Sequence, residues 1–260
     1  MLSDKLLSTR LFGIPAALLA LVLAGCSSAP TVSEGEIPPK RTLESVTAGD
    51  PPGKTYALEQ YDPIEGFNRG MYRFNAWFDD AIFLPLVGVY DFVLPDLVKT
   101  GIHNFMLNVG DIENLLNSVL QLKPKASLHS AGRLLVNTTI GVLGVWDPAT
   151  KMGLQRHDED FGQTLGYYGM GPGPYLVLPI LGPSSLRDGV GLAVDSYAFN
   201  EIDPLFFDSN DDSWEIGYRV TRALDTRYNI GFRYYQTGSP FEYELVRLLY
   251  LKKRELEIAR

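Results

Sequence analysis

Cysteine and histidine are nearly missing from this sequence. One cysteine and three histidines occur among 260 residues, so the chain cannot form an internal disulfide and offers few metal ligands. No histidine lies in the His-Glu-x-x-His spacing of a zinc site. The densest group of possible ligands is the segment 157–160 (HDED), which a polar loop explains equally well. The sequence therefore predicts neither a metal centre nor any other cofactor.

Motifs of nucleophilic catalysis and phosphate binding are missing too. Ser184 and Ser185 do not lie in the Gly-x-Ser-x-Gly turn of hydrolases. The segment 169–173 (GMGPG) resembles a phosphate loop only superficially, because it contains proline and no lysine follows it. We do not expect an enzyme. A hydrolase without these motifs is an alternative that nothing in the sequence supports.

The chain has fewer positively charged than negatively charged residues. The chain has 31 acidic and 23 basic residues, a formal net charge of −8. Such a chain is not attracted to the phosphates of a nucleic acid, nor to anionic lipid head groups by simple electrostatics. The charge balance therefore predicts no nucleic-acid partner.

A hydrophobic run of transmembrane length is also lacking at the start of the chain. The apolar run 11–23 follows Lys5 and Arg10 and is shorter than the roughly 18–20 residues that cross a bilayer. This pattern is typical of a secretory signal peptide, here over residues 1–25.

The lone cysteine ends a bacterial lipobox. The segment 23–26 (LAGC) predicts cleavage before Cys26 and lipidation of that residue with fatty acyl groups such as palmitate. Ser27 favours the outer membrane, because an aspartate at that position favours retention in the inner one. The alternative is an ordinary signal peptide with a cysteine there by chance.

The rest of the chain divides by composition. Residues 26–60 are rich in proline, glycine, serine and charge, which predicts a flexible linker with a span of roughly 30 Å. We expect a helical domain over 61–238 and a C-terminal helix over 239–260. The domain has no run of alternating strands and no internal repeat, so its class is mostly α with no substantial β-sheet.

Capping residues mark where helices are expected to begin. Asp62, Pro63 and Glu65 form a capping box with proline at its favoured position, and apolar residues then recur at helical spacing. Similar starts are expected at Ser184, Asp212 and Ser239, with further helices over 96–108, 111–122 and 124–137 separated by breaks near Gly110 and Lys123-Pro124.

Three apolar segments are unusual for a soluble helical bundle. They cover residues 81–95, 134–146 and 175–183, and none reaches the length of a spanning helix. They are either buried core or surfaces that face lipid, and the sequence pattern does not decide between the two.

Three blocks together resemble one protein family. They are 62–75 (DPIEGFNRGMYRFN), 137–149 (NTTIGVLGVWDPA) and 160–188 (DFGQTLGYYGMGPGPYLVLPILGPSSLRD). They look like the MlaA (VacJ) lipoproteins over about residues 60–200. The resemblance implies a helical ring that lies in the outer membrane around an amphipathic channel.

The resemblance also implies a function and partners. It predicts that the protein removes mislocalised phospholipids from the outer leaflet and passes them to a periplasmic lipid carrier of the MlaC kind, often beside a trimeric porin. This retrograde intermembrane lipid transfer maintains outer-membrane lipid asymmetry. The alternative is a structural or adaptor lipoprotein that binds a porin or envelope partner without moving lipid.

Three groups of residues are the candidate lipid-handling site under this hypothesis. The first helix would offer donors to a phosphate, the segment 140–146 would form a flexible gate hinged at two glycines, and the glycine-rich block would border the channel. The alternatives are a helix face that is solvated or bonds neighbouring backbone, an ordinary helix–loop connection and a packed loop, respectively. The candidates are Asn68, Arg69, Arg73, Phe74, Asn75, Ile140, Gly141, Gly144, Trp146, Gly169, Gly171, Gly173 and Tyr175.

Overall fold

The structure is a computed structural model, and it describes residues 58–207 and 213–260. These residues belong to one compact unit. The signal peptide, Cys26 and nearly all of the expected linker lie outside the described residues, so the lipobox stays a prediction.

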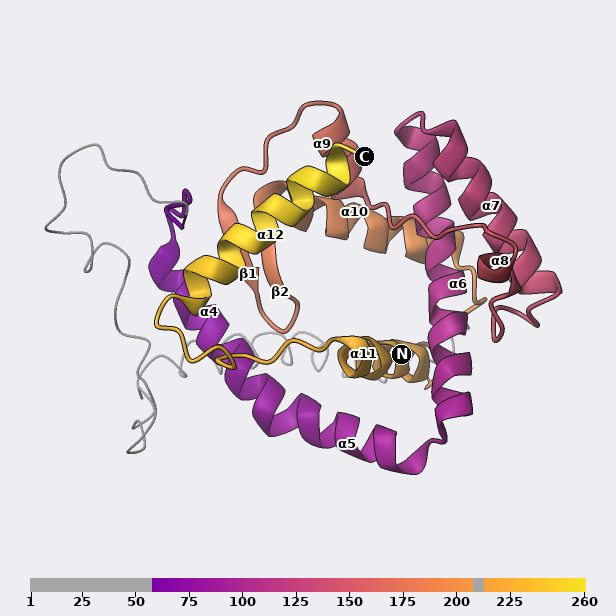
Figure 1. Ribbon diagram of the computed structural model, residues 1–260, viewed down its shortest axis with the longest axis horizontal. Helices are drawn as coiled ribbons and strands as arrows, with labels where there is room; N and C mark the ends of the chain where they lie inside the picture. The colour runs from indigo at the N-terminus through magenta and orange to yellow at the C-terminus, as the bar shows by residue number, and fades with distance from the viewer. Residues whose placement is uncertain (1–57, 208–212) are drawn as a thin grey trace, which may run out of the picture. The chain divides into compact units, whose positions relative to one another are not determined.

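Helices make up most of the described chain, which confirms the mostly α class. They are α4 (Glu65–Phe78), the π-helical turn η2 (Asp79–Phe83), α5 (Leu84–Val93), α6 (Asp96–Leu120), α7 (Pro124–Thr139), α8 (Pro148–Lys151), α9 (Phe161–Tyr167), α10 (Leu186–Ile202), α11 (Ser213–Asn229) and α12 (Glu242–Ile258). Figure 1 shows them arranged in a ring, with α4, α5 and α6 along its left-hand, lower and right-hand sides, α9, α10 and α12 along its upper side, and α11 between α4 and α6.

The break expected at Gly110 is wrong, because α6 continues through it as one helix of 25 residues. A glycine inside a helix costs only about 1 kcal/mol, and this one has a packing role. A Cβ atom at Gly110 would lie 3.2 Å from the guanidinium of Arg156. The break before Pro124 is present, since α6 ends at Leu120 and Pro124 is the first residue of α7.

Two of the expected helix caps have other roles. Asp62 precedes α4 by three residues, and its carboxylate accepts hydrogen bonds from Asn68 at 2.8 Å and Arg247 at 2.9 Å instead of capping the helix. Ser239 is likewise not the N-cap of α12, which begins at Glu242, but its side chain accepts from the N–H of Phe241 at 3.2 Å in the turn that leads into this helix. The cap expected at Ser184 belongs to its neighbour Ser185, whose side chain accepts from the backbone N–H of Asp188.

The apolar segment 175–183 forms most of a short hairpin. Strands β1 (Tyr175–Leu178) and β2 (Gly182–Ser185) pair antiparallel, with Tyr175 opposite Ser185 and Leu178 opposite Gly182. Ile180 in the turn adopts a left-handed conformation with φ +67°, as does Gly182 with φ +83°. This hairpin is the only sheet within residues 58–207 and 213–260.

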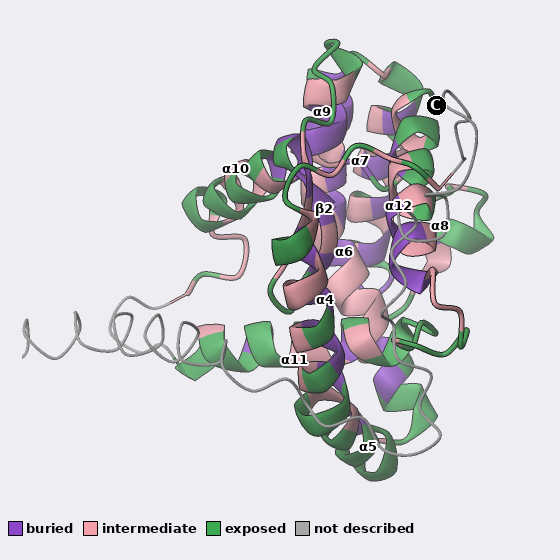
Figure 2. Cartoon of the chain, turned by 90° about the vertical axis from the view of Figure 1, so that its left-hand side faces the viewer, coloured by how far each residue is buried: buried purple, intermediate pink, exposed green. Residues whose placement is uncertain are grey.

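Polar side chains are buried and large apolar ones are exposed. In the described part of the chain, 25 buried residues are polar or charged and 11 are apolar. The buried face of α6 carries Asn108, Asp111, Asn114 and Asn117, and α5 is largely exposed in Figure 2 although it is almost entirely apolar. Water-soluble domains have the reverse distribution.

No helix in the described residues is by itself long and apolar enough to cross a bilayer. One bent pair, Glu65–Val93 with Asp96–Leu120, is long and apolar enough when its two arms are taken together, and the chain bends by 120° between them.

Candidate functional site

The first helix is attached to the hairpin by two buried asparagines. Asn68 donates its amide to the carbonyl oxygen of Tyr175 at 2.9 Å and accepts from the N–H of Val177 at 2.9 Å. Seven residues along the same face, Asn75 bonds the carbonyl oxygen of Leu178 at 2.9 Å and the N–H of Ile180 at 2.7 Å. The amides fix the hairpin backbone, which is the alternative role noted from the sequence. Asn68 has no hydrogen left for a phosphate, since its second N–H bonds Asp62.

The two arginines of α4 differ in whether their charge is already paired within the protein. Arg69 donates to Glu65 at 2.6 Å, contacts the buried Glu244 and lies over the ring of Tyr243 at 4.4 Å. Arg73 is exposed and forms no hydrogen bond or ion pair with a described residue. Of the donors expected in this helix, Arg73 is therefore the one that keeps its charge free for an anionic ligand.

Phe74 belongs to an aromatic group on the side of α4 away from the buried asparagines. Its ring centroid lies 6.0 Å from those of Trp77 and Phe78. Trp77 and Phe67 are exposed, so the aromatic side of this helix faces outward.

The glycine-rich block contains both tight turns and core. Gly169 and Gly173 adopt φ +91° and +67°, a conformation that side chains disfavour. Gly171 has no positive φ, and a Cβ added there would meet no atom within 4 Å. Tyr175, a candidate to border the channel, is instead 1% exposed, in a cluster with Tyr72, Val177 and Tyr243.

A buried charge network follows this block. Arg254 of α12 donates to Asp160 at 2.7 and 2.8 Å and to Asp188 at 3.0 Å. Burial opposes ionisation of Asp188, but hydrogen bonds from Arg254, Tyr250 and Ser185 outweigh it and lower its pKa. The network joins α12 to α9 and to the start of α10.

The expected gate segment, residues 140–146, is a series of tight turns that exposes apolar side chains. Ile140, Val142, Leu143 and Val145 are exposed, and Trp146 is 63% exposed. Val142, Leu143 and Gly144 have φ of +53°, +58° and +92°. A positive φ is costly for a β-branched residue such as Val142, so the surrounding contacts must hold this segment, which we call the 140–146 loop.

Both glycines of the 140–146 loop are required by close packing. A Cβ at Gly141 would lie 2.3 Å from the carbonyl oxygen of Trp146, and one at Gly144 would lie 2.4 Å from the Cβ of Asn108. Asn104 of α6 donates to the carbonyl oxygen of Val145 at 3.1 Å. These contacts hold the loop against α6 in the conformation described here.

Asp147 ends the 140–146 loop and caps α8. Its carboxylate accepts from the N–H of Thr150 and from Asn137 at 3.0 Å each, and from Arg133 at 3.1 Å. Burial opposes its ionisation, but the bonds from Thr150, Arg133 and Asn137 lower its pKa to about 2.

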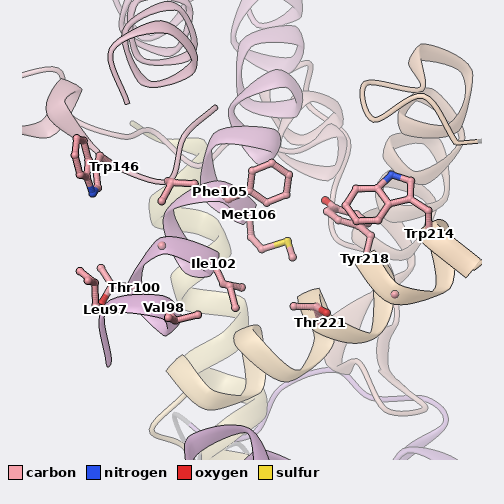
Figure 3. Close-up of a pocket in the computed structure, with 13 residues that line it drawn as sticks. Leu97, Val98, Thr100, Ile102, Phe105, Met106, Trp146, Trp214, Tyr218 and Thr221 are labelled. Atoms are coloured by element: carbon pink, nitrogen blue, oxygen red, sulfur yellow. The ribbon is translucent and has the colours of Figure 1, made fainter. Parts of the chain in front are cut away.

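An apolar cavity lies between α6 and α11, beside the 140–146 loop. Its volume is about 720 Å³, and Figure 3 shows Phe105 and Met106 of α6 across it from Trp214 and Tyr218 of α11. Sequence analysis missed this site. Its sequence signal was the glycine at 217 between aromatic residues at 214 and 218, which leaves space on one side of a helix.

The acidic segment 157–160 has structural roles. Asp160 caps α9 by accepting from the N–H of Gln163 at 2.8 Å, and Glu159 accepts from Gln121 at 2.9 Å. No group of three or more His, Cys, Asp or Glu side chains suited to a metal ion occurs within the described ranges.

Comparison with known proteins gives consistent matches. The family model for the MlaA lipoprotein matches residues 60–257. An uncharacterized protein of Rickettsia prowazekii is 36% identical over 203 residues, covering 77% of this chain and 79% of that protein. The intermembrane phospholipid transport system lipoprotein MlaA of Escherichia coli is 37% identical over 140 residues, covering 52% of this chain and 56% of that protein.

A solved structure has the same fold. It aligns with a TM-score of 0.61 at 29% identity, covering 76% of this chain and all of the other. That structure concerns the structural basis for the maintenance of bacterial outer-membrane lipid asymmetry.

Proposed function

Since this chain belongs to the MlaA lipoprotein family, we propose that it removes stray phospholipids from the outer leaflet of the outer membrane and passes them to a soluble periplasmic carrier. Family membership supports a part in intermembrane phospholipid transport in general, the system for which the Escherichia coli relative is named. Retrograde transfer of this kind would maintain lipid asymmetry, the subject of the related solved structure.

The observation that carries this proposal is the inverted distribution of polar and apolar side chains. Large exposed apolar surfaces are unfavourable in water and are typical of membrane or partner contacts. Here Phe92 of α5 is 91% exposed, and Trp77, Val89, Leu97 and Trp146 are also exposed. Their placement supports a ring whose outer side contacts acyl chains and whose inner side is polar.

Moving a phospholipid between membranes is limited by its acyl chains. Burial of a CH₂ group is worth about 0.8 kcal/mol, so two chains with roughly 30 methylenes hold the lipid in a bilayer by roughly 20–25 kcal/mol. The charged head group has the opposite difficulty, because hydrocarbon does not solvate it. A polar route beside an apolar surface lowers both costs, and such transport needs no catalytic group.

The candidate residues have definite parts in this proposal. Arg73 supplies a free positive charge to the phosphate. The 140–146 loop, with its exposed apolar side chains, controls access of acyl chains to the polar interior. Gly169, Gly171 and Gly173 allow the backbone before the hairpin to border that route.

The anchor and partners belong to the same proposal. Lipidated Cys26 holds the protein at the outer membrane, and the linker lets the helical domain enter the periplasmic leaflet. A periplasmic carrier accepts the lipid, and a trimeric porin beside the ring steadies it in the membrane.

The test is reconstituted transfer. Proteoliposomes that hold the lipidated protein and labelled phospholipid are mixed with the purified carrier, and lipid on the carrier is measured after separation. We expect the carrier to acquire label only in the presence of this protein. Carrier that stays empty, while the protein still binds a porin, would favour an adaptor and overturn the proposal. Release of free fatty acid would instead indicate a phospholipase.

A further inference from the structure

The apolar cavity between α6 and α11 has the size and lining of a ligand site. Its volume of about 720 Å³ lies in the range of small-molecule pockets. Apolar side chains from three parts of the chain form its walls, with few polar groups among them. They include Ile102, Phe105 and Met106 of α6, Trp146 of the 140–146 loop, and Trp214 of α11.

One polar group in this wall has no acceptor for its proton. The side chain of Tyr218 is 3% exposed, and its hydroxyl lies near the guanidinium of Arg222 but donates no hydrogen bond to a described residue. Figure 3 shows the hydroxyl directed from α11 towards α6. Burial raises the pKa of Tyr218, although nearby Arg222 lowers it in part, so the hydroxyl keeps its proton at neutral pH. A buried donor without an acceptor is unfavourable, which points to a ligand that brings an acceptor.

We propose that this cavity holds one fatty-acyl chain of a glycerophospholipid, and that Tyr218 donates a hydrogen bond to the ester carbonyl of that chain. This inference rests on the proposed function and assigns part of the lipid to a defined place. The methylenes contact the apolar walls, while the ester, where the chain meets the glycerol, supplies the acceptor that the protein lacks. A polar metabolite does not fit, because these walls would leave most of its hydrogen-bonding groups unpaired.

The position of the cavity connects it to the 140–146 loop. Val145 and Trp146 both border it, and the carbonyl oxygen of Val145 accepts from Asn104 of α6. An acyl chain in the cavity therefore touches the loop, and a movement of the loop would open or narrow its entry.

Gly217 allows the cavity to be filled without disturbing the fold. It lines the cavity, lies within α11, and a Cβ added there meets no atom within 4 Å. The substitution Gly217→Leu places a side chain in the space that the acyl chain would occupy. Gly88→Leu is the matched control, because Gly88 lies in α5, has the same freedom for a Cβ, and does not line the cavity.

The first experiment is photo-crosslinking in vesicles. The lipidated full-length protein is reconstituted with a phosphatidylethanolamine that carries a diazirine in one acyl chain, and labelled residues are identified by mass spectrometry. We expect label on Phe105, Met106 or Trp214 in the wild type and Gly88→Leu, and at least about a tenfold loss in Gly217→Leu. Unchanged labelling of these residues in Gly217→Leu, or no label there in the wild type, overturns the inference.

The second experiment isolates the hydrogen bond. Tyr218→Phe removes only the hydroxyl, and binding of a fluorescent ester-linked phospholipid is compared with that of its ether-linked analogue. Loss of one hydrogen bond predicts about a five- to tenfold weaker affinity for the ester lipid and little change for the ether lipid. Equal effects on both lipids, or no effect on either, overturn the role of Tyr218.

Failure of this inference is distinguishable from failure of the proposed function. If Gly217→Leu delivers phospholipid to the carrier at the wild-type rate and keeps its crosslinks, the chain lies elsewhere and transport stands. If the wild type delivers no lipid, the proposed function fails, whatever the cavity binds. If the acyl groups of the protein's own anchor occupied the cavity, a Cys26→Ala variant would crosslink more strongly than the wild type, and the phospholipid assignment would be wrong.

Discussion

Asn68 of α4 donates a 2.9 Å hydrogen bond to the carbonyl oxygen of Tyr175, a residue 107 positions later in the chain. The same side chain accepts from the N–H of Val177. An irregular, proline-rich hairpin has few backbone partners of its own, and a buried amide supplies them. Buried polar side chains of α4 thus hold elements of this protein together, as apolar side chains do in the core of a soluble protein.

Replacement of Asn68 by alanine should destabilise the protein by about 2–4 kcal/mol. It removes three hydrogen bonds and leaves the carbonyl of Tyr175 and the N–H of Val177 buried without partners. Chemical unfolding in detergent micelles measures the difference. Arg73→Ala, at an exposed site on the same helix, is the control and should change stability by less than about 0.5 kcal/mol. Equal stability of the two variants would contradict the role given to Asn68.

Loss of Arg254 should release the C-terminal helix. Arg254→Met leaves the carboxylate of Asp160 without its guanidinium partner and that of Asp188 with Arg187 alone, and removing one member of a buried ion pair costs about 3–5 kcal/mol. We expect faster proteolysis within α12 than in the wild type. Lys252→Met is the control, because Lys252 forms only an exposed pair with Glu255. Proteolysis of α12 at the same rate in both variants would show that the network does not hold the helix.

The carboxyl of Asp147 should make stability depend on pH in the acid range. Its pKa is lowered from 3.8 to about 2 in the folded protein. A lowered pKa means that the stabilisation is complete above about pH 4 and disappears as pH falls through about 2. Asp147→Asn should therefore unfold more easily than the wild type by about 1–2 kcal/mol at pH 7, with the difference vanishing near pH 2.

Thermal unfolding followed between pH 2 and 7 tests this prediction. Asp158→Asn is the control, because the Asp158 side chain is 75% exposed and pairs only with Arg156. A difference between Asp147→Asn and the wild type that persists unchanged at pH 2 would show that the charge of Asp147 is not the cause.

Local signals in the sequence predicted where helices begin and end better than they predicted which residues those helices contact. The break before Pro124 follows from the chemistry of proline at a helix start, and α7 does begin there. The break at Gly110 was not present, because the cost of a helical glycine is small beside the packing that α6 gains. The capping box at Asp62 failed because its carboxylate bonds the side chain of Asn68 in α4 and that of Arg247, which only the fold brings close.

Only part of the candidate site was predictable from the sequence, again because local patterns do not reveal contacts that the fold creates. The sequence indicated that residues 140–146 are apolar and hinged at two glycines, and the structure has exposed apolar side chains there on a series of tight turns, while the role of a gate stays a prediction. Periodicity could not reveal that Phe67 and Trp77 of α4 lie outside and its asparagines inside, because a helical pattern has the same period whichever face is buried. It also could not reveal the cavity, which needs two helices that are far apart in sequence.

Substitution of Gly141 by alanine should rearrange the 140–146 loop. The added Cβ would lie 2.3 Å from the carbonyl oxygen of Trp146 and 2.5 Å from that of Asn137, so the backbone must move. We expect a change in tryptophan fluorescence and a lower unfolding temperature. Gly66→Ala in α4, where a Cβ meets nothing within 4 Å, should leave fluorescence unchanged and stability equal or higher. If Gly141→Ala behaved as Gly66→Ala does, the loop would be less constrained than its contacts indicate.

A charge on the outer side of α5 should weaken membrane insertion without harming the fold. Phe92 is 91% exposed, so Phe92→Lys removes little internal packing. In a bilayer the same change loses a buried aromatic and places an ammonium near hydrocarbon, which together cost several kcal/mol. Vesicle flotation should therefore show at least about a tenfold lower bound fraction, measured on protein without its lipid anchor so that only the domain contributes.

The control for this prediction lies on α12. Leu256 is 71% exposed but is surrounded by Lys252, Lys253, Glu255 and Glu257, a charged surface that is expected to stay in water. Leu256→Lys should float with vesicles as the wild type does. If both variants bound vesicles equally, the exposed apolar side of α5 would have to face a protein partner, and the proposal that the ring contacts acyl chains there would fail even if lipid transfer were observed.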